Sequence, residues 1–240
     1  MIFTACMADD NNTDKPSLVK NSSSSIGFCG FLGMVAHLVS IVFCGIIIYH
    51  AWPGSSLFSW HPTLMCVSFA FLMAEAILFF SPESTLLPKA MRKTKVKYHW
   101  INMVTAIACA VAGLVIIFIN KNIHGKSHFT SWHGILGLIT VIYSCLQSTG
   151  GTLLLYPKVV SGMVKLADLK LYHATSGLLL FTLACTTLIL GLYSNWFVSQ
   201  VSDTVWYISF LCPGLIGLVV MNQVTTAYLP KAFKKPSQQI

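Results

Sequence analysis

Six long apolar runs dominate the pattern of hydrophobic and polar positions along the chain. Each is close to the ~20 residues that an α-helix needs to cross the hydrocarbon core of a membrane. None shows the two-residue alternation of barrel strands, and backbone groups in lipid must be hydrogen-bonded within the segment. The pattern therefore predicts an all-α bundle of six transmembrane helices, near residues 27–49, 61–80, 99–119, 133–155, 173–194 and 205–228.

The polar ends of the chain are predicted to lie outside this bundle. Residues 1–26 include three aspartates and the serine run 22–25, and they have too little apolar surface to fold alone, so we expect a disordered tail. Residues 27–230 are expected to form one transmembrane domain, and residues 231–240 a basic tail. No basic segment precedes the first run and no small-residue cleavage site follows it, so that run is expected to be retained.

Composition supports a membrane protein. The chain is 55% hydrophobic and 9% charged, with a mean hydropathy of +0.72, which excludes an ordinary soluble domain. Its 8 cysteines are scattered singly with no CxxC motif, so we interpret them as small buried hydrophobic residues. The net charge of +8 does not indicate nucleic-acid binding, because the basic residues lie in loops beside the apolar runs.

Those basic residues predict the orientation in the membrane. If successive helices alternate in direction, all of the 15 lysines and arginines except Lys121 and Lys126 fall on one side. The positive-inside rule then places both termini in the cytosol. The sequons at Asn11 and Asn21 lie in the amino-terminal tail, so we expect them to remain unglycosylated.

Four histidines recur at the starts of the predicted helices. His61, His99, His133 and His173 stand at or near the start of the second to fifth runs, one helix and one loop apart each time. Because neighbouring helices are antiparallel, His61 and His133 are expected towards the outer face, and His99 and His173 towards the cytosol. The sequence thus predicts two layers with two imidazoles each.

Facing imidazoles inside a membrane indicate a metal or haem iron. Haem iron with histidine on both sides has no open position for a substrate, so electron transfer is its natural chemistry. The alternative is that these histidines only extend to the membrane interface as amphipathic side chains. Gly137 and Gly177 follow His133 and His173 by four residues on the same helix face, where they would leave room for a flat macrocycle.

Other polar residues of the runs are less specific. His37, inside the first run, and His50, near its end, are expected to make hydrogen bonds in the packing. Glu75 lies about 21 Å along the helix from His61, at ~1.5 Å per residue, and hence near the cytosolic layer. We expect it to make an interhelical hydrogen bond; bonding to a histidine ligand or accepting a proton are the alternatives.

Specific stretches of the sequence resemble the cytochrome b561 family, above all its small members, the cytochrome b561 domain-containing proteins. The resemblance covers roughly residues 30–230 and rests on PGSSLFSWHP (53–62), MAEAILFFSPES (73–84), KVKYHW (95–100), SWHG (131–134), LKLYHATSGL (169–178) and MNQV (221–224). It implies that the central four helices hold two haems b, one between His61 and His133 and one between His99 and His173. It also implies an ascorbate-dependent transmembrane reductase that passes electrons from cytosolic ascorbate to monodehydroascorbate or ferric iron.

The resemblance also suggests where the substrates bind. In the family, basic residues just before the helix-3 histidine hold ascorbate, which implies Lys93 and Lys97 here; a topological role alone is the alternative. Ascorbate is a monoanion at pH 7, so a basic loop would attract it.

The substrate sites also depart from the family pattern. Where relatives often have a basic residue six positions before His173, this chain has Ala167 followed by Asp168, leaving Lys165 or Lys170 as substitutes.

On the outer side, Asn122 stands where some relatives use a histidine, which leaves the electron acceptor open. His128, with His124 and Lys126 in the same loop, is expected to contact the acceptor or the haem propionates, or else only solvent.

Two other functions remain open from the sequence. One is a proton-coupled transporter that uses Glu75 and the histidines, although no pair of Gly/Pro-broken helices supports it. The other is a haem-binding scaffold or sensor without turnover. Resemblance to the small family members implies endoplasmic reticulum or vesicle membranes, and no retention or lipidation signal is found. Whether the protein forms a homodimer is also left open.

Overall fold

The computed structural model describes residues 19–81, 84–159 and 164–232, and in that part of the chain all regular structure is helical. Six segments are long and apolar enough to cross a membrane, which confirms the predicted all-α fold and an integral, multi-pass membrane protein. Five of them are the helices α1 (Val19–Ala51), α4 (Arg92–Ile123), α5 (Trp132–Leu155), α6 (Leu166–Gly191) and α8 (Asp203–Ala232). The second span is composite, with α2 (Trp60–Met65), a π-helix (Cys66–Met73) and α3 (Ala74–Leu78).

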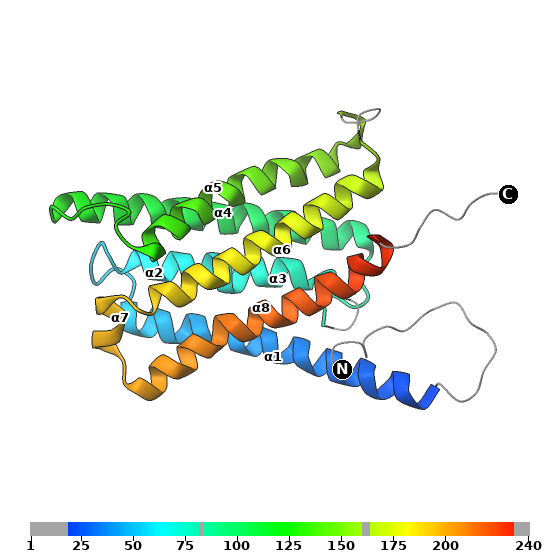
Figure 1. Cartoon of the computed structure of the whole chain (residues 1–240), viewed down its shortest axis with the longest axis horizontal. Coiled ribbons are helices and arrows are strands. Elements are labelled where there is room, and N and C mark those ends of the chain that lie inside the picture. Colours follow the sequence, from blue (N-terminus) through cyan, green and yellow to red (C-terminus); the bar gives the residue numbers. More distant parts are fainter. Residues whose placement is uncertain (1–18, 82–83, 160–163, 233–240) are drawn as a thin grey trace.

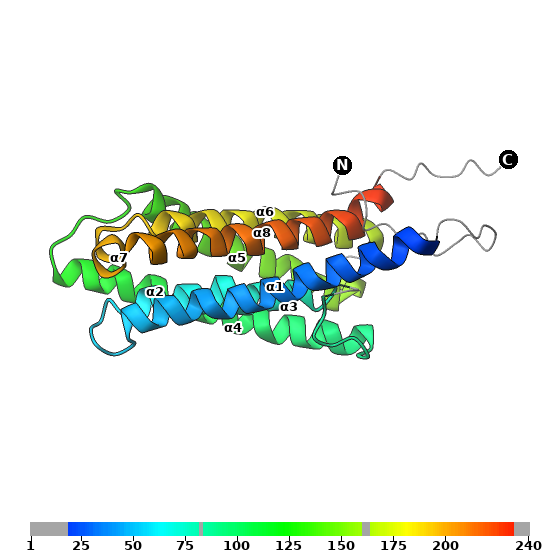
Figure 2. The same cartoon turned by 90° about the horizontal axis from the view of Figure 1, so that it is seen from below.

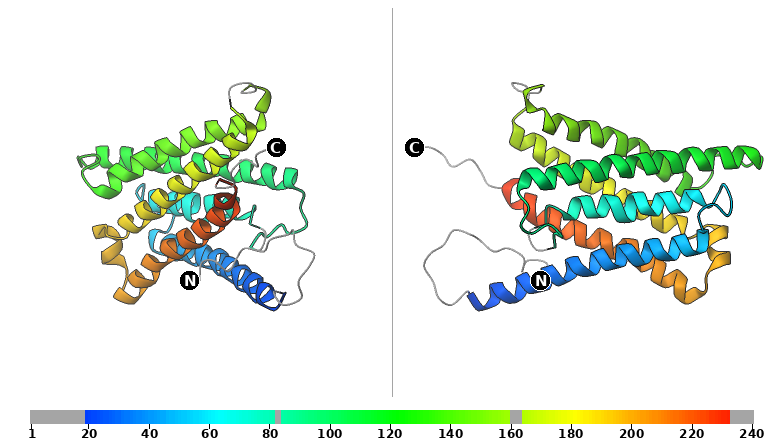
Figure 3. Two further views of the ribbon diagram at one scale, coloured as in Figure 1. Left: turned by 45° about the vertical axis from the view of Figure 1, so that its right-hand side comes forward. Right: turned by 180° about the vertical axis from the view of Figure 1, so that it is seen from behind.

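The spans run roughly along the long axis of the molecule (Figure 1). Both described ends of the chain lie at one end of the bundle, together with the α3–α4 and α5–α6 connections, and α7 (Asn195–Gln200) lies at the other. Seen from below, α6 and α8 lie above α1 and α4 (Figure 2). α1 packs against α8 and the second span, α4 packs against the second span and α5, and α6 packs against α5 and α8. The view from behind shows α4 along the second span (Figure 3).

Several helices begin earlier than their apolar runs. α4 starts at Arg92 and α6 at Leu166, each seven residues before its histidine, and α1 starts at Val19, inside the tail expected to be disordered. An apolar run shows only the part of a helix that lies in hydrocarbon. A formed helix can continue beyond the membrane, because each added residue gains a backbone hydrogen bond and charged side chains are solvated there. His99 and His173 therefore lie two turns inside their helices, not at their starts.

Buried apolar residues form a core along the axis of the bundle, and large apolar residues such as Leu38, Ile142 and Leu211 are exposed on its outside, where lipid would cover them. The short α7, which the apolar pattern did not predict, buries Phe197 in this core. Four of the described cysteines are buried, but Cys145 is exposed on α5, so interpreting every cysteine as buried is wrong. Residues 1–18 and 233–240 lie outside the described residues.

Candidate functional site: two facing histidine pairs

The four candidate histidines meet in two pairs at opposite ends of the bundle. His61 of α2 faces His133 of α5, with ring centroids 6.2 Å apart and ring planes at 79°. His99 of α4 faces His173 of α6, with ring centroids 6.3 Å apart and planes at 80°. These are the pairs that alternating helix direction predicts.

The spacing within each pair fits one metal ion between two imidazoles. Bonds of about 2 Å from the metal to a nitrogen on each side, plus roughly 1 Å from each nitrogen to its ring centre, give a centroid separation of about 6 Å. Within the described residues, no group of three or more His, Cys, Asp or Glu side chains could hold a metal ion. Haem iron fits such a site because the porphyrin occupies the other positions and the protein supplies only two axial ligands.

The sequence around His61 and His133, here called the outer pair after the predicted orientation, determines where their helices begin. Ser131 caps α5, its Oγ accepting a hydrogen bond from Gly134 N at 3.2 Å, and His133 is the second residue of that helix. His61 is likewise the second residue of α2, and Pro62, which needs no hydrogen-bond acceptor, follows it in the first turn. Both outer imidazoles therefore project from the first turns of their helices.

Backbone carbonyls orient three of the four rings. Nδ1 of His61 donates to Gly113 O at 3.0 Å, and Nδ1 of His133 donates to Thr187 O at 3.0 Å. In the other pair, Nδ1 of His99 donates to Ala76 O at 2.9 Å. A carbonyl oxygen only accepts, so the proton of each ring is on Nδ1. Nε2 is then unprotonated, which is the tautomer that a metal needs.

The accepting carbonyls follow a repeat along the chain. Gly113 lies fourteen residues after His99, so α4 supplies an imidazole at one level and a carbonyl at the other, about 20 Å away along the helix. Thr187 lies fourteen residues after His173. Ala76 lies fifteen residues after His61, and the extra residue falls in a span whose middle is a π-helix, which takes more residues per turn.

His173 has a different neighbour. Its Nδ1 lies 3.2 Å from Nε2 of Gln147, which stands fourteen residues after His133, the same place in the repeat. The Gln147 amide also donates to His173 O at 2.6 Å and accepts from Ser176 Oγ at 2.8 Å. The amide nitrogen can only donate, so Nδ1 of His173 accepts a hydrogen bond from Gln147, the reverse of the other three rings. Gln147 is not among the residues predicted from the sequence, although the fourteen-residue spacing after His133 marks it.

Glycines of the neighbouring helix make room for two of the rings. A Cβ atom on Gly191 would lie 3.1 Å from Cε1 of His133, and one on Gly151 would lie 3.0 Å from Cε1 of His173. They are not the glycines that the sequence predicts to leave room for a flat macrocycle, which are Gly137 and Gly177.

The two proposed glycines have different surroundings. Gly137 lines the cavity beside His133, but a Cβ atom on Gly177 would lie 3.0 Å from Nε2 of Gln147, so the space expected there is occupied. The prediction for Gly177 is wrong because the Gln147 side chain fills the face that helical spacing alone leaves open.

A cavity of about 730 Å³, including its open mouth, lies beside the outer pair. Its walls are mainly apolar, and besides the two histidines of the pair its polar lining residues are Lys121, His128, Ser131 and Thr187. The His128 ring stacks on Phe118 with centroids 4.1 Å apart, and its Nε2 lies 2.7 Å from Asn122 Oδ1. Asn122 thus orients His128 towards the cavity.

Lys126, the cation expected at this outer site, is exposed and does not line the cavity. Lys121 lines the cavity instead, and its Nζ donates a hydrogen bond to Ser127 O at 2.9 Å. Lys121 lies in the last turn of α4 and is therefore held by the helix, whereas Lys126 lies in the loop beyond it.

The His99–His173 pair, here called the cytosolic pair after the predicted orientation, lies at the end of the bundle where the basic starts of α4 and α6 are. Lys93 and Lys97 are exposed on the first two turns of α4, and Lys170 is exposed near the start of α6. These helices also carry His99 and His173, and the ring of Phe80 packs edge-on to His99 with centroids 5.3 Å apart. The contacts that Lys93, Lys97 and Lys170 make with a substrate remain a prediction.

Six membrane-spanning helices with paired imidazoles at two levels are the arrangement expected of a membrane cytochrome b. The chain belongs to the cytochrome b561 family: the family model for eukaryotic cytochrome b561 matches residues 60–198. Membership implies haem b as the cofactor.

Named relatives agree with this family. The chain is 49% identical over 197 residues to transmembrane reductase CYB561D2 of Bos taurus, covering 82% of this chain and 88% of the relative. It is 41% identical over 199 residues to probable transmembrane reductase CYB561D1 of Mus musculus, covering 83% and 86%. A more distant relative, the plasma membrane ascorbate-dependent reductase CYBRD1 of Mus musculus, is 28% identical over 183 residues, covering 71% and 62%.

Proposed function

We propose that this protein is a transmembrane di-haem b oxidoreductase that moves electrons from cytosolic ascorbate to monodehydroascorbate or ferric iron on the other side. The observation that carries the proposal is the pairing of four imidazoles at two levels, with ring centroids 6.2 and 6.3 Å apart. In this proposal His61 and His133 hold the outer haem, and His99 and His173 hold the cytosolic haem. The relatives named as transmembrane and ascorbate-dependent reductases support the same activity.

The protein's own groups prepare the two sites for electron transfer. A haem held by each pair of imidazoles would supply one-electron chemistry. The carbonyls of Gly113, Thr187 and Ala76 hold the rings in place and would make Nε2 a stronger donor to a bound metal. The apolar helices around both pairs exclude water and competing ligands.

Charge on the two faces selects the substrates. Lys93 and Lys97, with Lys170 on α6, attract the ascorbate monoanion to the cytosolic pair. On the other face, Lys121 and His128, which line the cavity, would meet an anionic acceptor or the haem propionates. The proposal also keeps both termini in the cytosol and the protein in endoplasmic reticulum or vesicle membranes. A homodimer is compatible with it and is not needed for either site.

The proposal is tested by recording the visible spectrum of the purified protein before and after adding ascorbate. We expect the spectrum of a six-coordinate haem b, with two haems per chain, and reduction of both by ascorbate. In sealed vesicles with ferric iron enclosed on the outer-face side, ascorbate on the cytosolic-face side should produce ferrous iron inside. A colourless protein would favour a transporter, and a coloured protein that ascorbate does not reduce would favour a scaffold.

A further inference from the structure

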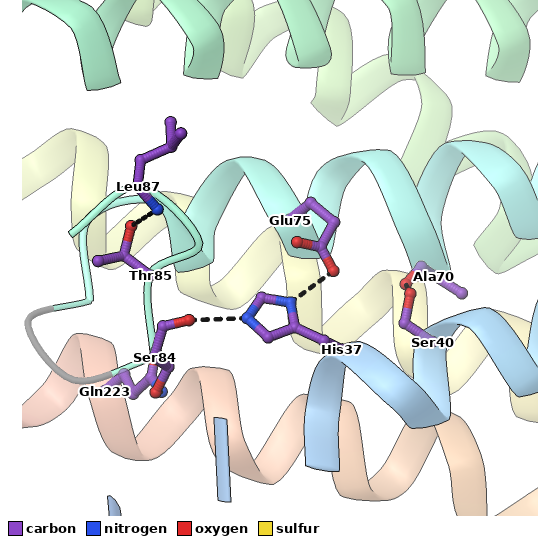
Figure 4. A network of polar contacts seen from close by, with 8 residues as sticks. All are labelled: His37, Ser40, Ala70, Glu75, Ser84, Thr85, Leu87 and Gln223. Carbon is purple, nitrogen blue, oxygen red and sulfur yellow. Dashed lines mark hydrogen bonds and ion pairs between the residues drawn. The ribbon is translucent and has the colours of Figure 1, made fainter. Parts of the chain in front are cut away.

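Glu75 of α3 and His37 of α1 form a buried pair (Figure 4), 5% and 6% exposed. Nδ1 of His37 lies 2.7 Å from Oε1 of Glu75, and Nε2 lies 2.7 Å from the backbone oxygen of Ser84. The interhelical hydrogen bond expected of Glu75 is confirmed, and its partner is His37, not a histidine of the two facing pairs. The pair joins α1, α3 and the segment that leads to α4.

The surroundings hold this pair in place. The amide of Gln223 on α8 donates to Ser84 Oγ at 2.5 Å, and Ser84 N donates to Ser81 Oγ at 3.1 Å. A Cβ atom on Gly33, one turn before His37, would overlap the side chain of Ser84, so the glycine allows this segment to reach α1. The geometry around His37 is therefore built by three separate parts of the chain.

The two contacts of the His37 ring fix the number of protons in the pair. The Ser84 carbonyl can only accept, so Nε2 carries a proton. A distance of 2.7 Å between Nδ1 and Oε1 requires a second proton between them. Whether that proton is on nitrogen or oxygen, the pair has a net charge of zero, which is the state that an interior with a low dielectric constant favours.

The other oxygen of Glu75 can take one more proton. Within the described residues, Oε2 is the only buried side-chain nitrogen or oxygen atom without a hydrogen-bond partner. A proton bound there changes the charge of the pair from zero to plus one without breaking either hydrogen bond of His37.

The pair lies at the level of the cytosolic histidines. The residue after Glu75 is Ala76, whose carbonyl accepts the hydrogen bond from Nδ1 of His99. Of the elements packed against α3, α1 brings His37, α4 brings His99, and α8 brings the uncharged amide of Gln223. The π-helix contains one titratable group, Cys66, at its start. The first two turns of α4 also carry the basic residues Arg92, Lys93, Lys95 and Lys97.

We propose that the Glu75–His37 pair is a proton-uptake site that compensates the charge of an electron arriving between His99 and His173. When a haem held by His99 and His173 takes one electron from the reductant, going from ferric to ferrous, Oε2 of Glu75 would gain one O–H bond with a proton from cytosolic water. Glu75 releases this proton when the electron moves on. This inference rests on the proposed haem between His99 and His173, but it does not depend on which reductant supplies the electron.

The test is a potentiometric titration of the purified holoprotein at several pH values, with Glu75→Gln compared with the wild type. Glutamine can still donate from its amide to Nδ1 of His37, so the hydrogen bond is kept while the proton site is lost. We expect the midpoint potential of the cytosolic haem to fall with rising pH in the wild type and to become independent of pH in the variant. Asp203→Asn, which changes an exposed carboxylate at the other end of the bundle, should behave like the wild type.

Infrared difference spectra of the reduced and oxidised wild-type protein give a second measurement that needs no variant. Reduction should add the carbonyl band of a protonated carboxyl group, or shift that band where Oε1 already holds the shared proton, and Glu75→Gln should remove this change while Asp203→Asn keeps it. A wild-type protein that shows neither change on reduction overturns the inference, as does an unchanged pH dependence in Glu75→Gln. A protein without haem would instead contradict the proposed function, so the two failures can be distinguished.

Discussion

Gly151 of α5 and His173 of α6 are so close that a Cβ atom on the glycine would lie 3.0 Å from Cε1 of the imidazole. The same relationship recurs at the other level, where Gly191 of α6 faces His133 of α5 at 3.1 Å. Each of these helices therefore supplies one imidazole and the empty space for the imidazole of its neighbour.

Filling that space should displace one ring and leave the other level intact. We expect Gly151→Val to lose about one haem per chain from the cytosolic site, because the added side chain has no room beside His173. Haem content and the reduced visible spectrum of the purified protein measure this. The matched control is Gly150→Val, since a Cβ atom at Gly150 meets nothing within 4 Å. Equal haem content in both variants would show that the glycine is not needed for the ring.

The corresponding substitution on α6 should affect the outer site. Gly191→Val is expected to remove about one haem, because the added side chain displaces the ring of His133. The remaining haem should still be reduced by ascorbate from the cytosolic face. Electron delivery to an acceptor on the other side should stop. Continued delivery at the wild-type rate would mean that electrons do not pass through the outer pair.

Removing positive charge near the cytosolic pair should weaken ascorbate binding. We expect Lys93→Gln with Lys97→Gln to raise KM for ascorbate by about tenfold and to change kcat little, because the lost attraction acts on the bound anion. In the wild type, KM should rise with ionic strength, and this salt dependence should be smaller in the variant. An unchanged KM, with full haem content, would leave these lysines with a role in topology alone.

The orientation in the membrane predicts an absence of glycan. Asn11 and Asn21 should remain unmodified in a eukaryotic expression host, and tags at both termini should be accessible when only the plasma membrane is made permeable. Glycosylation of either asparagine would invert the topology and exchange the donor and acceptor faces.

The sequence was sufficient for the fold and for the pairing of the four histidines, because both depend on helix length and alternating direction. It also identified Glu75 and His37 as groups that make hydrogen bonds in the packing, although not that they bond to each other. Which groups bond to each other depends on the contacts between helices. Here the segment at Ser84 reaches α1 and bonds to the His37 ring.

Other parts of the site could not be predicted from helical spacing. The roles of Gln147, Gly151 and Gly191 depend on the angle at which α5 crosses α6. The apolar pattern of either helix alone does not predict this crossing angle. The π-helix shifts Ala76 by one residue relative to the repeat, and no proline or glycine between Cys66 and Met73 marks it. The sequence favours Lys126 over Lys121 because it does not show that α4 continues to Ile123 and so holds Lys121 beside the cavity.

The central claim is that two pairs of imidazoles each hold one haem at a different level. It is tested most directly by the haem content and potentiometric titration of His61→Ala and His99→Ala beside the wild type. We predict two haems in the wild type and about one in each variant, with the remaining haem at a different midpoint potential in the two variants. The account would be contradicted if either variant kept both haems, or if both lost the haem with the same potential.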